Sequence, residues 1–230
     1  MPKPYFEAQG VTLYHGDCRD FEQRCDLLLT DPPYGQEFKS GWTENWGRIV
    51  GDNDLGGVQE RIAKALKGLG RGRHTYIFGG KFDLTKLNLS GFTELIWDKE
   101  VIGMGDLSQP WGLQHEKITF AVHEISKSNR ERGVGNLAAR LRKGSVLRCL
   151  RAQGSGIRYH PTEKPVEILR QLIESSSVMG ETIYDPFAGS GSTLIAAALE
   201  GRIAIGVEID ERYCEIAAER FQREIPQIAA

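Results

Sequence analysis

Short apolar runs of strand length alternate with helical patterns along this chain of 230 residues. Most of these runs are apolar throughout, which is typical of strands buried on both faces of a sheet. Strands that alternate with helices favour an α/β fold with a mainly parallel sheet. We predict seven strands, at residues 11–15, 26–30, 74–79, 93–97, 118–123, 182–184 and 203–209. We predict helices at residues 55–69, 166–176, 191–199 and 211–221.

The composition excludes several classes of protein. Hydrophobic residues make up 40% of the chain and charged residues 26%, as in an ordinary globular domain. The longest uncharged, apolar-leaning stretch, 187–199, is far shorter than the ~20 residues of a membrane span. The four cysteines lack the spacings of zinc or redox motifs, the histidines form no ligand pair, and no secretory signal pattern is seen. We therefore expect a reduced cytoplasmic protein without a metal site.

Charge is distributed unevenly along the chain. The whole sequence carries 29 Lys and Arg against 31 Asp and Glu, a formal charge of −2. Residues 124–159 alone hold nine basic and two acidic side chains, a balance of +7, which leaves −9 for the remainder. This segment also loses the apolar periodicity of its surroundings. The asymmetry is more informative than the total, and a solvated charged loop is the alternative to a binding segment.

A glycine-rich turn, residues 185–193, follows the strand predicted at 182–184 and precedes a helix. Gly189 and Gly191 let the backbone turn sharply and approach a ligand, to which the helix presents free amide groups. The turn lacks the lysine of a phosphate-binding loop and the third glycine of a dinucleotide site. Glu208 ends the next strand, where a carboxylate can bind ribose hydroxyls. The pattern favours a nucleoside-type site over a simple turn.

A second turn, Asp31-Pro32-Pro33-Tyr34, follows the strand predicted at 26–30. The two prolines fix two backbone φ angles and make the turn rigid. Its carboxylate and the carbonyl of Pro32 are both acceptors, which suits a ligand amino group with two protons to donate. Tyr34 offers a flat ring for stacking on a planar ligand. A plain turn that ends a buried strand is the alternative.

Taken together, these motifs resemble those of S-adenosylmethionine-dependent DNA amino-methyltransferases of the permuted, beta-type arrangement. In that family the Asp-Pro-Pro-Tyr motif precedes the Asp-Pro-Phe-x-Gly-Ser-Gly motif, as 31–34 and 185–191 do here. Further matches lie at residues 16–18, 160–165 and 206–210. The resemblance implies an α/β, Rossmann-like, seven-stranded sheet flanked by helices, in circularly permuted motif order. It also implies a single methyltransferase domain, residues 1–230, with a small basic target-recognition insertion at 124–159.

The resemblance implies S-adenosyl-L-methionine as cofactor. Thr162 and Lys164 would lie near its methionine carboxylate, Glu208 would hold its ribose, and Asp17 would accept from its adenine amino group. Alternatively, Asp17 caps a helix and Lys164 is a solvated charge. The full set of expected cofactor-binding residues is Asp17, Cys18, Thr162, Lys164, Asp185, Pro186, Phe187, Ala188, Gly189, Ser190, Gly191, Ser192, Thr193 and Glu208.

The resemblance also implies a mechanism at the second turn. A flipped-out base would stack on Tyr34 while Asp31 and the Pro32 carbonyl take the protons of its amino group. The expected catalytic residues are Asp31, Pro32, Pro33 and Tyr34. Adenine N6 is favoured because cytosine-N4 enzymes that resemble this family often carry Ser at the first motif position. The alternatives are a cytosine-N4 DNA methyltransferase, an RNA methyltransferase and a non-catalytic DNA-binding protein.

The basic segment then has double-stranded DNA as its expected partner, because cationic side chains there would contact phosphates or guanine edges. We expect a site-specific methyltransferase of a restriction-modification type in a bacterial or phage-infected cell. The short recognition segment favours a homodimer. The expected DNA-binding residues are Lys127, Arg130, Arg132, Arg140, Arg142, Lys143, Arg148, Arg151 and Arg158.

Overall fold

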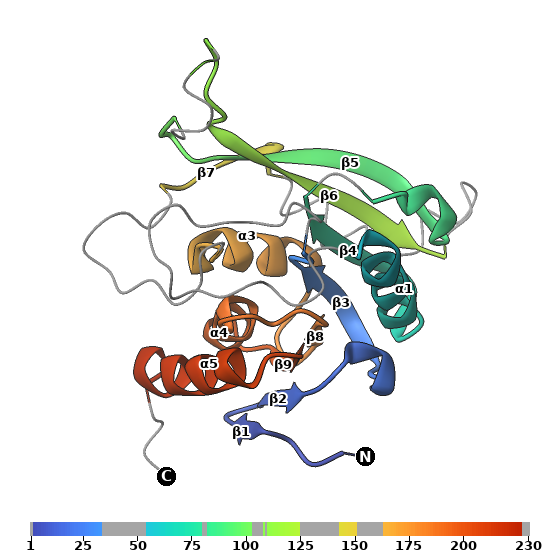
Figure 1. Cartoon of the computed structure of the whole chain (residues 1–230), viewed down its shortest axis with the longest axis vertical. Coiled ribbons are helices and arrows are strands. Elements are labelled where there is room, and N and C mark those ends of the chain that lie inside the picture. Colours follow the sequence, from blue (N-terminus) through green and yellow to red (C-terminus); the bar gives the residue numbers. More distant parts are fainter. Residues whose placement is uncertain are drawn as a thin grey trace.

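The computed structural model describes residues 2–33, 54–79, 82–102, 108, 110–124, 143–150 and 163–226. Within them, nine strands form one sheet, with helices on both of its faces (Figure 1). The strands are β1 (Phe6–Ala8), β2 (Val11–His15), β3 (Cys25–Thr30), β4 (Leu69–Phe78), β5 (Leu89–Asp98), β6 (His115–His123), β7 (Val146–Arg148), β8 (Thr182–Asp185) and β9 (Ile203–Glu208). The helices are α1 (Leu55–Leu66), α3 (Val166–Ser176), α4 (Ser192–Leu199) and α5 (Glu211–Glu224), with 3₁₀ helices η1 (Cys18–Asp20) and η3 (Leu84–Lys86).

The order of the strands creates a natural binding edge. They follow the order β1-β2-β9-β8-β3-β4-β6-β5-β7. The centre of the sheet, from β2 to β4, is parallel throughout, whereas β6 is antiparallel to β4 and β5. The chain runs outward from β8 to β9 on one side and from β3 to β4 on the other. The winding direction therefore reverses between β8 and β3, and α/β sheets bind ligands beyond the carboxyl ends of strands at such a point.

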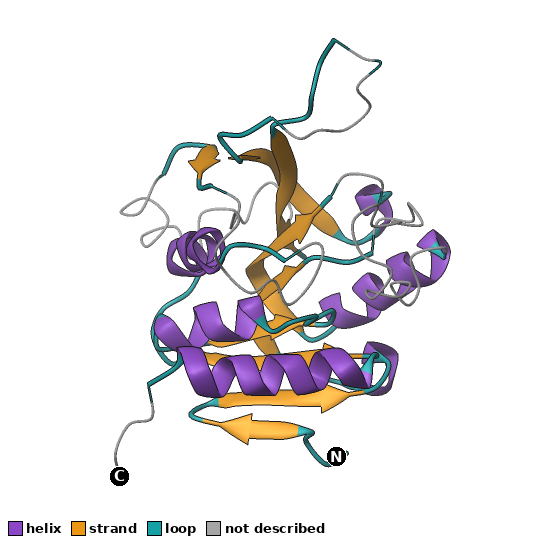
Figure 2. Cartoon of the chain, turned by 60° about the vertical axis from the view of Figure 1, so that its left-hand side comes forward, coloured by secondary structure: helices purple, strands orange, loops and turns teal. Residues whose placement is uncertain are grey.

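Strand β3 shows that the sheet is buried on both faces. Leu27 and Leu29 belong to the core that α3, α4 and α5 cover, whereas Leu28 belongs to the core under α1. All three side chains are fully buried. Figure 2 shows the helices, in purple, on either side of the strands. None of the helices in the described ranges is long and apolar enough to span a membrane.

The seven predicted strands and four predicted helices are all present, and α3 has the predicted bounds. The helix predicted at 55–69 instead ends at Leu66. A Cβ atom on Gly68 would lie 1.7 Å from the backbone oxygen of Gln23. The chain turns at residues 67–68, where Gly68 packs against the backbone of Gln23, and Leu69 is the first residue of β4 rather than part of the helix.

The predicted number of strands was too low, because β1 and β7 were missed. Strand β1 is antiparallel to β2, and β7 is parallel to β5. Strand β7 lies inside 124–159, the segment predicted as an insertion. Its middle residue, Leu147, is buried between an exposed Val146 and an exposed Arg148. Three residues are too few for an alternating pattern to stand out from a polar segment.

Candidate functional site

The two turns found in the sequence meet at the carboxyl ends of β3 and β8, which are neighbours in the sheet. Asp31 directly follows β3, and Asp185 is the last residue of β8. The hydroxyl group of Thr30 donates a hydrogen bond of 2.9 Å to Oδ1 of Asp185, and both residues are buried. This bond connects the two motifs across 155 positions of the sequence.

Asp185 anchors the glycine-rich turn from inside. Its Oδ1 also accepts a hydrogen bond of 3.1 Å from the backbone N–H of Phe187. Burial raises the pKa of Asp185 to about 6, although hydrogen bonds from Thr193, Phe187 and Thr30 oppose the rise. The carboxyl group therefore ties the turn to β3 and to the first residues of α4.

The two glycines of this turn have different surroundings. Both have positive φ angles, +50° at Gly189 and +80° at Gly191. A Cβ atom on Gly191 would lie 3.0 Å from Cβ of Ala217, so this glycine lets α4 begin close against α5. A Cβ atom on Gly189 would meet no heavy atom within 4 Å. Gly189 thus leaves an open side at which a ligand can approach the backbone.

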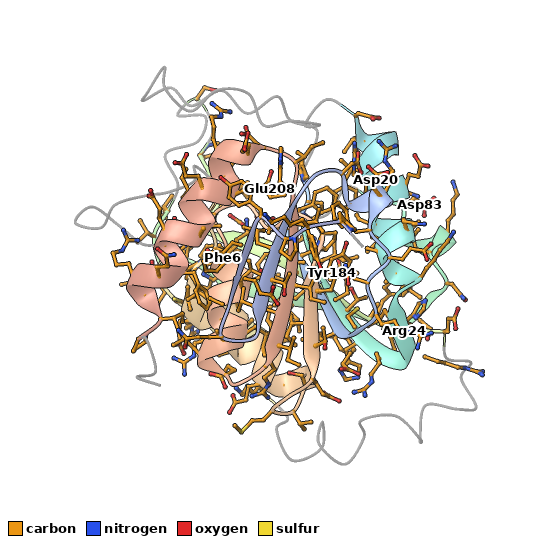
Figure 3. The ribbon with its side chains drawn as sticks, turned by 90° about the horizontal axis from the view of Figure 1, so that it is seen from below. Phe6, Asp20, Arg24, Asp83, Tyr184 and Glu208 are labelled. Carbon is orange, nitrogen blue, oxygen red and sulfur yellow. The ribbon has the colours of Figure 1, made fainter. Side chains whose placement is uncertain are left out.

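Glu208 lies beside that open side, where β9 leads into α5 (Figure 3). Its Oε2 accepts a hydrogen bond of 2.8 Å from the N–H of Gly189, and its Oε1 accepts one of 2.9 Å from the N–H of Asp210. Burial raises the pKa of Glu208, and the two backbone hydrogen bonds counteract this. Each carboxylate oxygen can accept a second bond, which suits a pair of ribose hydroxyls.

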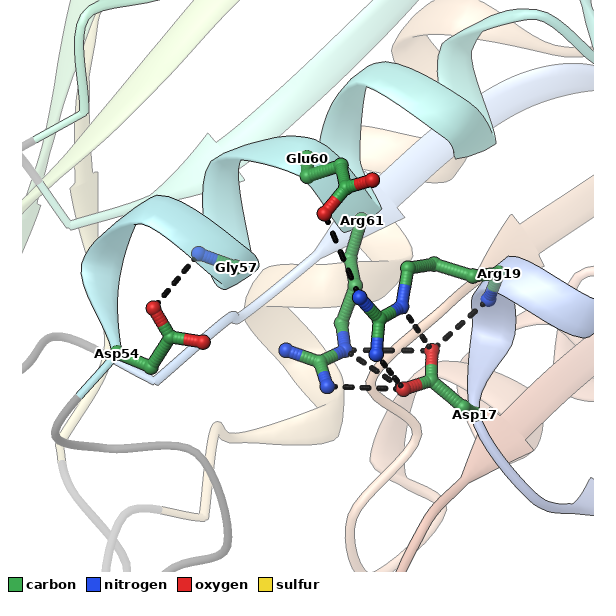
Figure 4. Close-up of polar contacts among 6 residues, drawn as sticks. All are labelled: Asp17, Arg19, Asp54, Gly57, Glu60 and Arg61. Atoms are coloured by element: carbon green, nitrogen blue, oxygen red, sulfur yellow. Dashed lines mark hydrogen bonds and ion pairs between the residues drawn. The ribbon is translucent and has the colours of Figure 1, made fainter.

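Asp17 follows β2 and is held by two arginines (Figure 4). Its carboxylate lies 2.8 Å from Nη2 of Arg19 and 2.8 Å from Nη2 of Arg61. It also accepts from the N–H of Arg19 and so caps η1, the role that the sequence left as an alternative. Burial alone would raise the pKa of Asp17, but the hydrogen bonds from Arg19 and Arg61 hold it well below its usual range. The bond to a cofactor adenine stays a prediction.

Lys164 is buried, which contradicts the alternative that it is a solvated charge. Its Nζ lies 2.5 Å from Oδ2 of Asp31 and 3.3 Å from Oε2 of Glu116, a residue of β6. Glu116 was not among the predicted site residues. A charged residue near one end of an apolar strand was the only signal for it. The contact of Lys164 with a cofactor carboxylate also stays a prediction.

Arg220 of α5 is a second residue that the sequence did not reveal. It is buried, and its Nη1 donates 2.8 Å to the hydroxyl of Ser192 and 3.4 Å to the carbonyl of Ser190. Its Nη2 forms an ion pair of 2.9 Å with Glu163, and its Nε one of 2.8 Å with Glu224. The two predicted cofactor-binding serines therefore support the turn through this guanidinium group.

The structure places the remaining predicted residues in three groups. Cys18, Pro32, Pro186 and Ala188 are buried and Pro33 is half-buried, and burial raises the pKa of the Cys18 thiol to about 12. Of the predicted DNA-binding residues, Lys143 pairs with Glu174, and Arg148 lies 3.7 Å from Asp98. The predicted residues that lie outside the described ranges are Tyr34, Lys127, Arg130, Arg132, Arg140, Arg142, Arg151, Arg158 and Thr162.

Comparison with known proteins identifies the family. Residues 93–219, more than half of the chain, match the N6_N4_Mtase family model, described as DNA methylase. The type II methyltransferase M2.MboI of Moraxella bovis is 28% identical over 97% of this chain and 93% of its own length. The DNA adenine methyltransferase YhdJ of Escherichia coli is 25% identical over 94% of this chain and 84% of its own length.

A solved structure shares the arrangement of the sheet. TTHA0409 of Thermus thermophilus, assigned as a DNA modification methylase and solved in complex with S-adenosyl-L-methionine, superposes with a TM-score of 0.64. It is 25% identical, and the match covers 94% of this chain and 95% of that one. The open side of Gly189 beside the Glu208 carboxylate fits such a ligand. The chain therefore belongs to the N6_N4_Mtase family of DNA methylases, and S-adenosyl-L-methionine is its cofactor.

Proposed function

We propose that this chain methylates the exocyclic N6 of adenine in double-stranded DNA, with the target base flipped out of the duplex. The observation that supports this most is the position of Asp31, one residue beyond the hydrogen bond by which Thr30 joins Asp185. An acceptor group therefore stands next to the turn that binds the cofactor. A base inside a duplex cannot reach a group in such a place, so it has to leave the stack.

The chain's own residues have distinct tasks at this site. When bound, the cofactor supplies a methyl group on a positively charged sulfur. Gly189 gives the ligand close access to the backbone, and Glu208 offers its carboxylate oxygens to the ribose hydroxyls. Asp17, which two arginines hold in place, would accept from the adenine amino group of the cofactor. A cofactor held by these residues would lie next to Asp31, which follows the residue bonded to Asp185.

Asp31 and the Pro32 carbonyl would accept the two protons of the target amino group. These bonds localise the lone pair of the nitrogen and direct it at the methyl carbon. The nitrogen gains its bond to that carbon as the bond from carbon to sulfur breaks, and one amino proton leaves through Asp31. The chemistry needs positioning and electrostatic support rather than a covalent intermediate on the protein.

Adenine is the favoured base for two reasons. Asp31 stands at the first motif position, where cytosine-N4 enzymes often have Ser, and the Escherichia coli relative is named a DNA adenine methyltransferase. A cytosine amino group presents the same two protons, so cytosine N4 is the second candidate. RNA as substrate, and DNA binding without catalysis, are the weaker candidates.

The test is to incubate the protein with labelled S-adenosylmethionine and either unmethylated DNA or RNA, and then to identify the methylated nucleosides. We expect N6-methyladenine in DNA only. Asp31→Ala should abolish the label, whereas Asp20→Ala, at an exposed position of η1, should leave it unchanged. Label in N4-methylcytosine would refute the adenine assignment, and no label in either nucleic acid would refute the enzymatic one.

The proposed DNA contacts can be tested separately from catalysis. We expect the nine basic residues predicted between Lys127 and Arg158 to contact DNA, and the protein to act as a homodimer. Replacing Arg148 and Lys143 with Gln should weaken DNA binding and reduce its salt dependence. Filter binding at several salt concentrations measures this, and sedimentation measures the oligomeric state. An unchanged salt slope would argue against contacts from these two residues.

A further inference from the structure

Four charged side chains, among them Asp31, are connected by a series of ion pairs. Nζ of Lys164 lies 2.5 Å from Oδ2 of Asp31 and 3.3 Å from Oε2 of Glu116. The other oxygen of Glu116, Oε1, lies 2.7 Å from Nζ of Lys99. Negative and positive groups alternate along this series of ion pairs. We call its members, Asp31, Lys164, Glu116 and Lys99, the charge relay. They come from four segments: the turn after β3, the residue after β5, strand β6 and the approach to α3.

The centre of the charge relay is shielded from water. The side chain of Lys164 is 5% exposed, and its ammonium group also lies 5.3 Å from the centre of the Phe78 ring. Lys99 packs in the same way, 5.3 Å from the centre of the Trp97 ring. Ion pairs in such surroundings are strong and costly to break, because the partner left behind is a buried charge. The position of Asp31 therefore depends on the residues behind it.

Lys164 divides its charge between two carboxylates. With Glu116 present, the ammonium group is shared, and Asp31 keeps part of its negative charge for a ligand. Without the charge of Glu116, Lys164 would be attracted more strongly to Asp31, neutralise it more fully and draw it toward the interior. Glu116 also keeps Lys99 and Lys164 from repelling each other. Glu116 would thus affect the position of Asp31, and how strongly Asp31 accepts hydrogen bonds, without contacting a substrate itself.

We infer that Glu116 is a positioning residue for methyl transfer, which acts on Asp31 through Lys164 and is itself held by Lys99. This inference rests on the proposed role of Asp31. In this arrangement Lys164 is the ion-pair partner of the catalytic carboxylate, Asp31. The antiparallel strands β5 and β6 would then support catalysis, because Glu116 lies in β6 and Lys99 directly follows β5.

The test is the substitution Glu116→Gln, which keeps the shape of the side chain and removes its charge. We expect kcat to fall by about 10- to 100-fold, the size of effect that a small misplacement of a catalytic group produces. The KM for S-adenosylmethionine, and its affinity measured by calorimetry, should stay within about twofold, because the ion pairs of Glu116 are with Lys99 and Lys164 and not with residues of the glycine-rich turn. Glu94→Gln is the matched control. Glu94 pairs with Lys117 at 2.9 Å across the same two strands, but both side chains are exposed.

A double-mutant cycle with Lys99→Met distinguishes an effect that is transmitted through the ion pairs from a general loss of structure. Lys99→Met alone should also lower kcat, and in its background Glu116→Gln should cost clearly less than in the native protein. If Glu116→Gln folds poorly, the kcat of Lys99→Met alone still tests the inference, because Lys99 contacts Glu116 and the pair of Asp31 and Lys164 stays intact. Thermal unfolding checks the fold of each variant.

Three outcomes would overturn the inference. These are a native kcat in Glu116→Gln, a loss that appears only as weaker cofactor binding, and strictly additive effects with Lys99→Met. All three require that the native protein methylates DNA. A native protein that transfers no label would instead refute the proposed function, so the two failures are distinguishable.

Discussion

The buried carboxyl group of Asp185 should make the stability of the protein fall as the pH rises from about 4 to about 6. Its pKa is raised from the ordinary value of 3.8 to about 6, chiefly by burial. A raised pKa means that the folded state binds the proton more tightly than the unfolded state does. The stabilisation is complete below pH 3.8 and is lost as the pH rises through 6. Asp185→Asn is the perturbation that removes this dependence.

The size of the effect follows from the shift. A change of about two pH units corresponds to about 3 kcal/mol, at ~1.4 kcal/mol per unit. Asparagine has the same shape as aspartate, and its Oδ1 can still accept from Thr30 and Phe187, as Oδ1 of Asp185 does. We therefore expect the variant to lack the pH dependence of Asp185 while keeping the turn. The amide would face Thr193, which can accept from it.

The measurement is urea unfolding of both proteins at several pH values between about 4 and about 7.5. Other groups titrate over this range in both proteins, so the difference between the two free energies of unfolding isolates Asp185. We expect the native protein to lose about 2.5 kcal/mol relative to Asp185→Asn over this range, since the rest of the effect is already lost at pH 4. A difference that stays constant with pH would show that the carboxyl group is not buried as described.

Three further substitutions test the turn. Gly191→Ala should cost about 1–3 kcal/mol of stability, because its φ is positive and Ala217 blocks the added methyl group. Gly189→Ala meets open space, so we expect a smaller loss of stability but cofactor binding weakened by about tenfold or more in calorimetry. Arg220→Met should cost about 1–3 kcal/mol in urea unfolding, since it removes the buried donor of the Ser190 carbonyl and the Ser192 hydroxyl. Native-like results would contradict each expectation.

Local patterns were sufficient to predict most of the fold. The periodic apolar face of α3 was enough to predict its bounds, and seven short apolar runs marked seven of the strands. These elements were predictable because burial on a sheet imposes a strong period or an unbroken apolar run. Strand β7 was not predictable, because its pairing with β5 depends on a partner about 50 positions away rather than on its own three residues.

The site was predictable only where one motif carried the chemistry. The turns at Asp31 and Asp185 were recognised from their own residues, and the sheet brings them together. Glu116 and Arg220 were missed because each acts through partners far away in the sequence, and neither belongs to a local motif. For Lys164, the motif indicated a site residue, but the identity of its partners depended on tertiary packing.

The strand order also has a consequence for how the chain folds. Strands β2 and β3 are separated in the sheet by β8 and β9, which follow more than 150 positions later. As the chain leaves the ribosome, the edge of β2 that pairs with β9 and the edge of β3 that pairs with β8 stay unpaired, with exposed apolar side chains, until those strands emerge. Such distant pairing slows folding and exposes edges that can aggregate. The strand order that brings both turns together therefore delays completion of the sheet until β8 and β9 have been synthesised. A chaperone that shields β2 and β3 until then should raise the yield of folded protein.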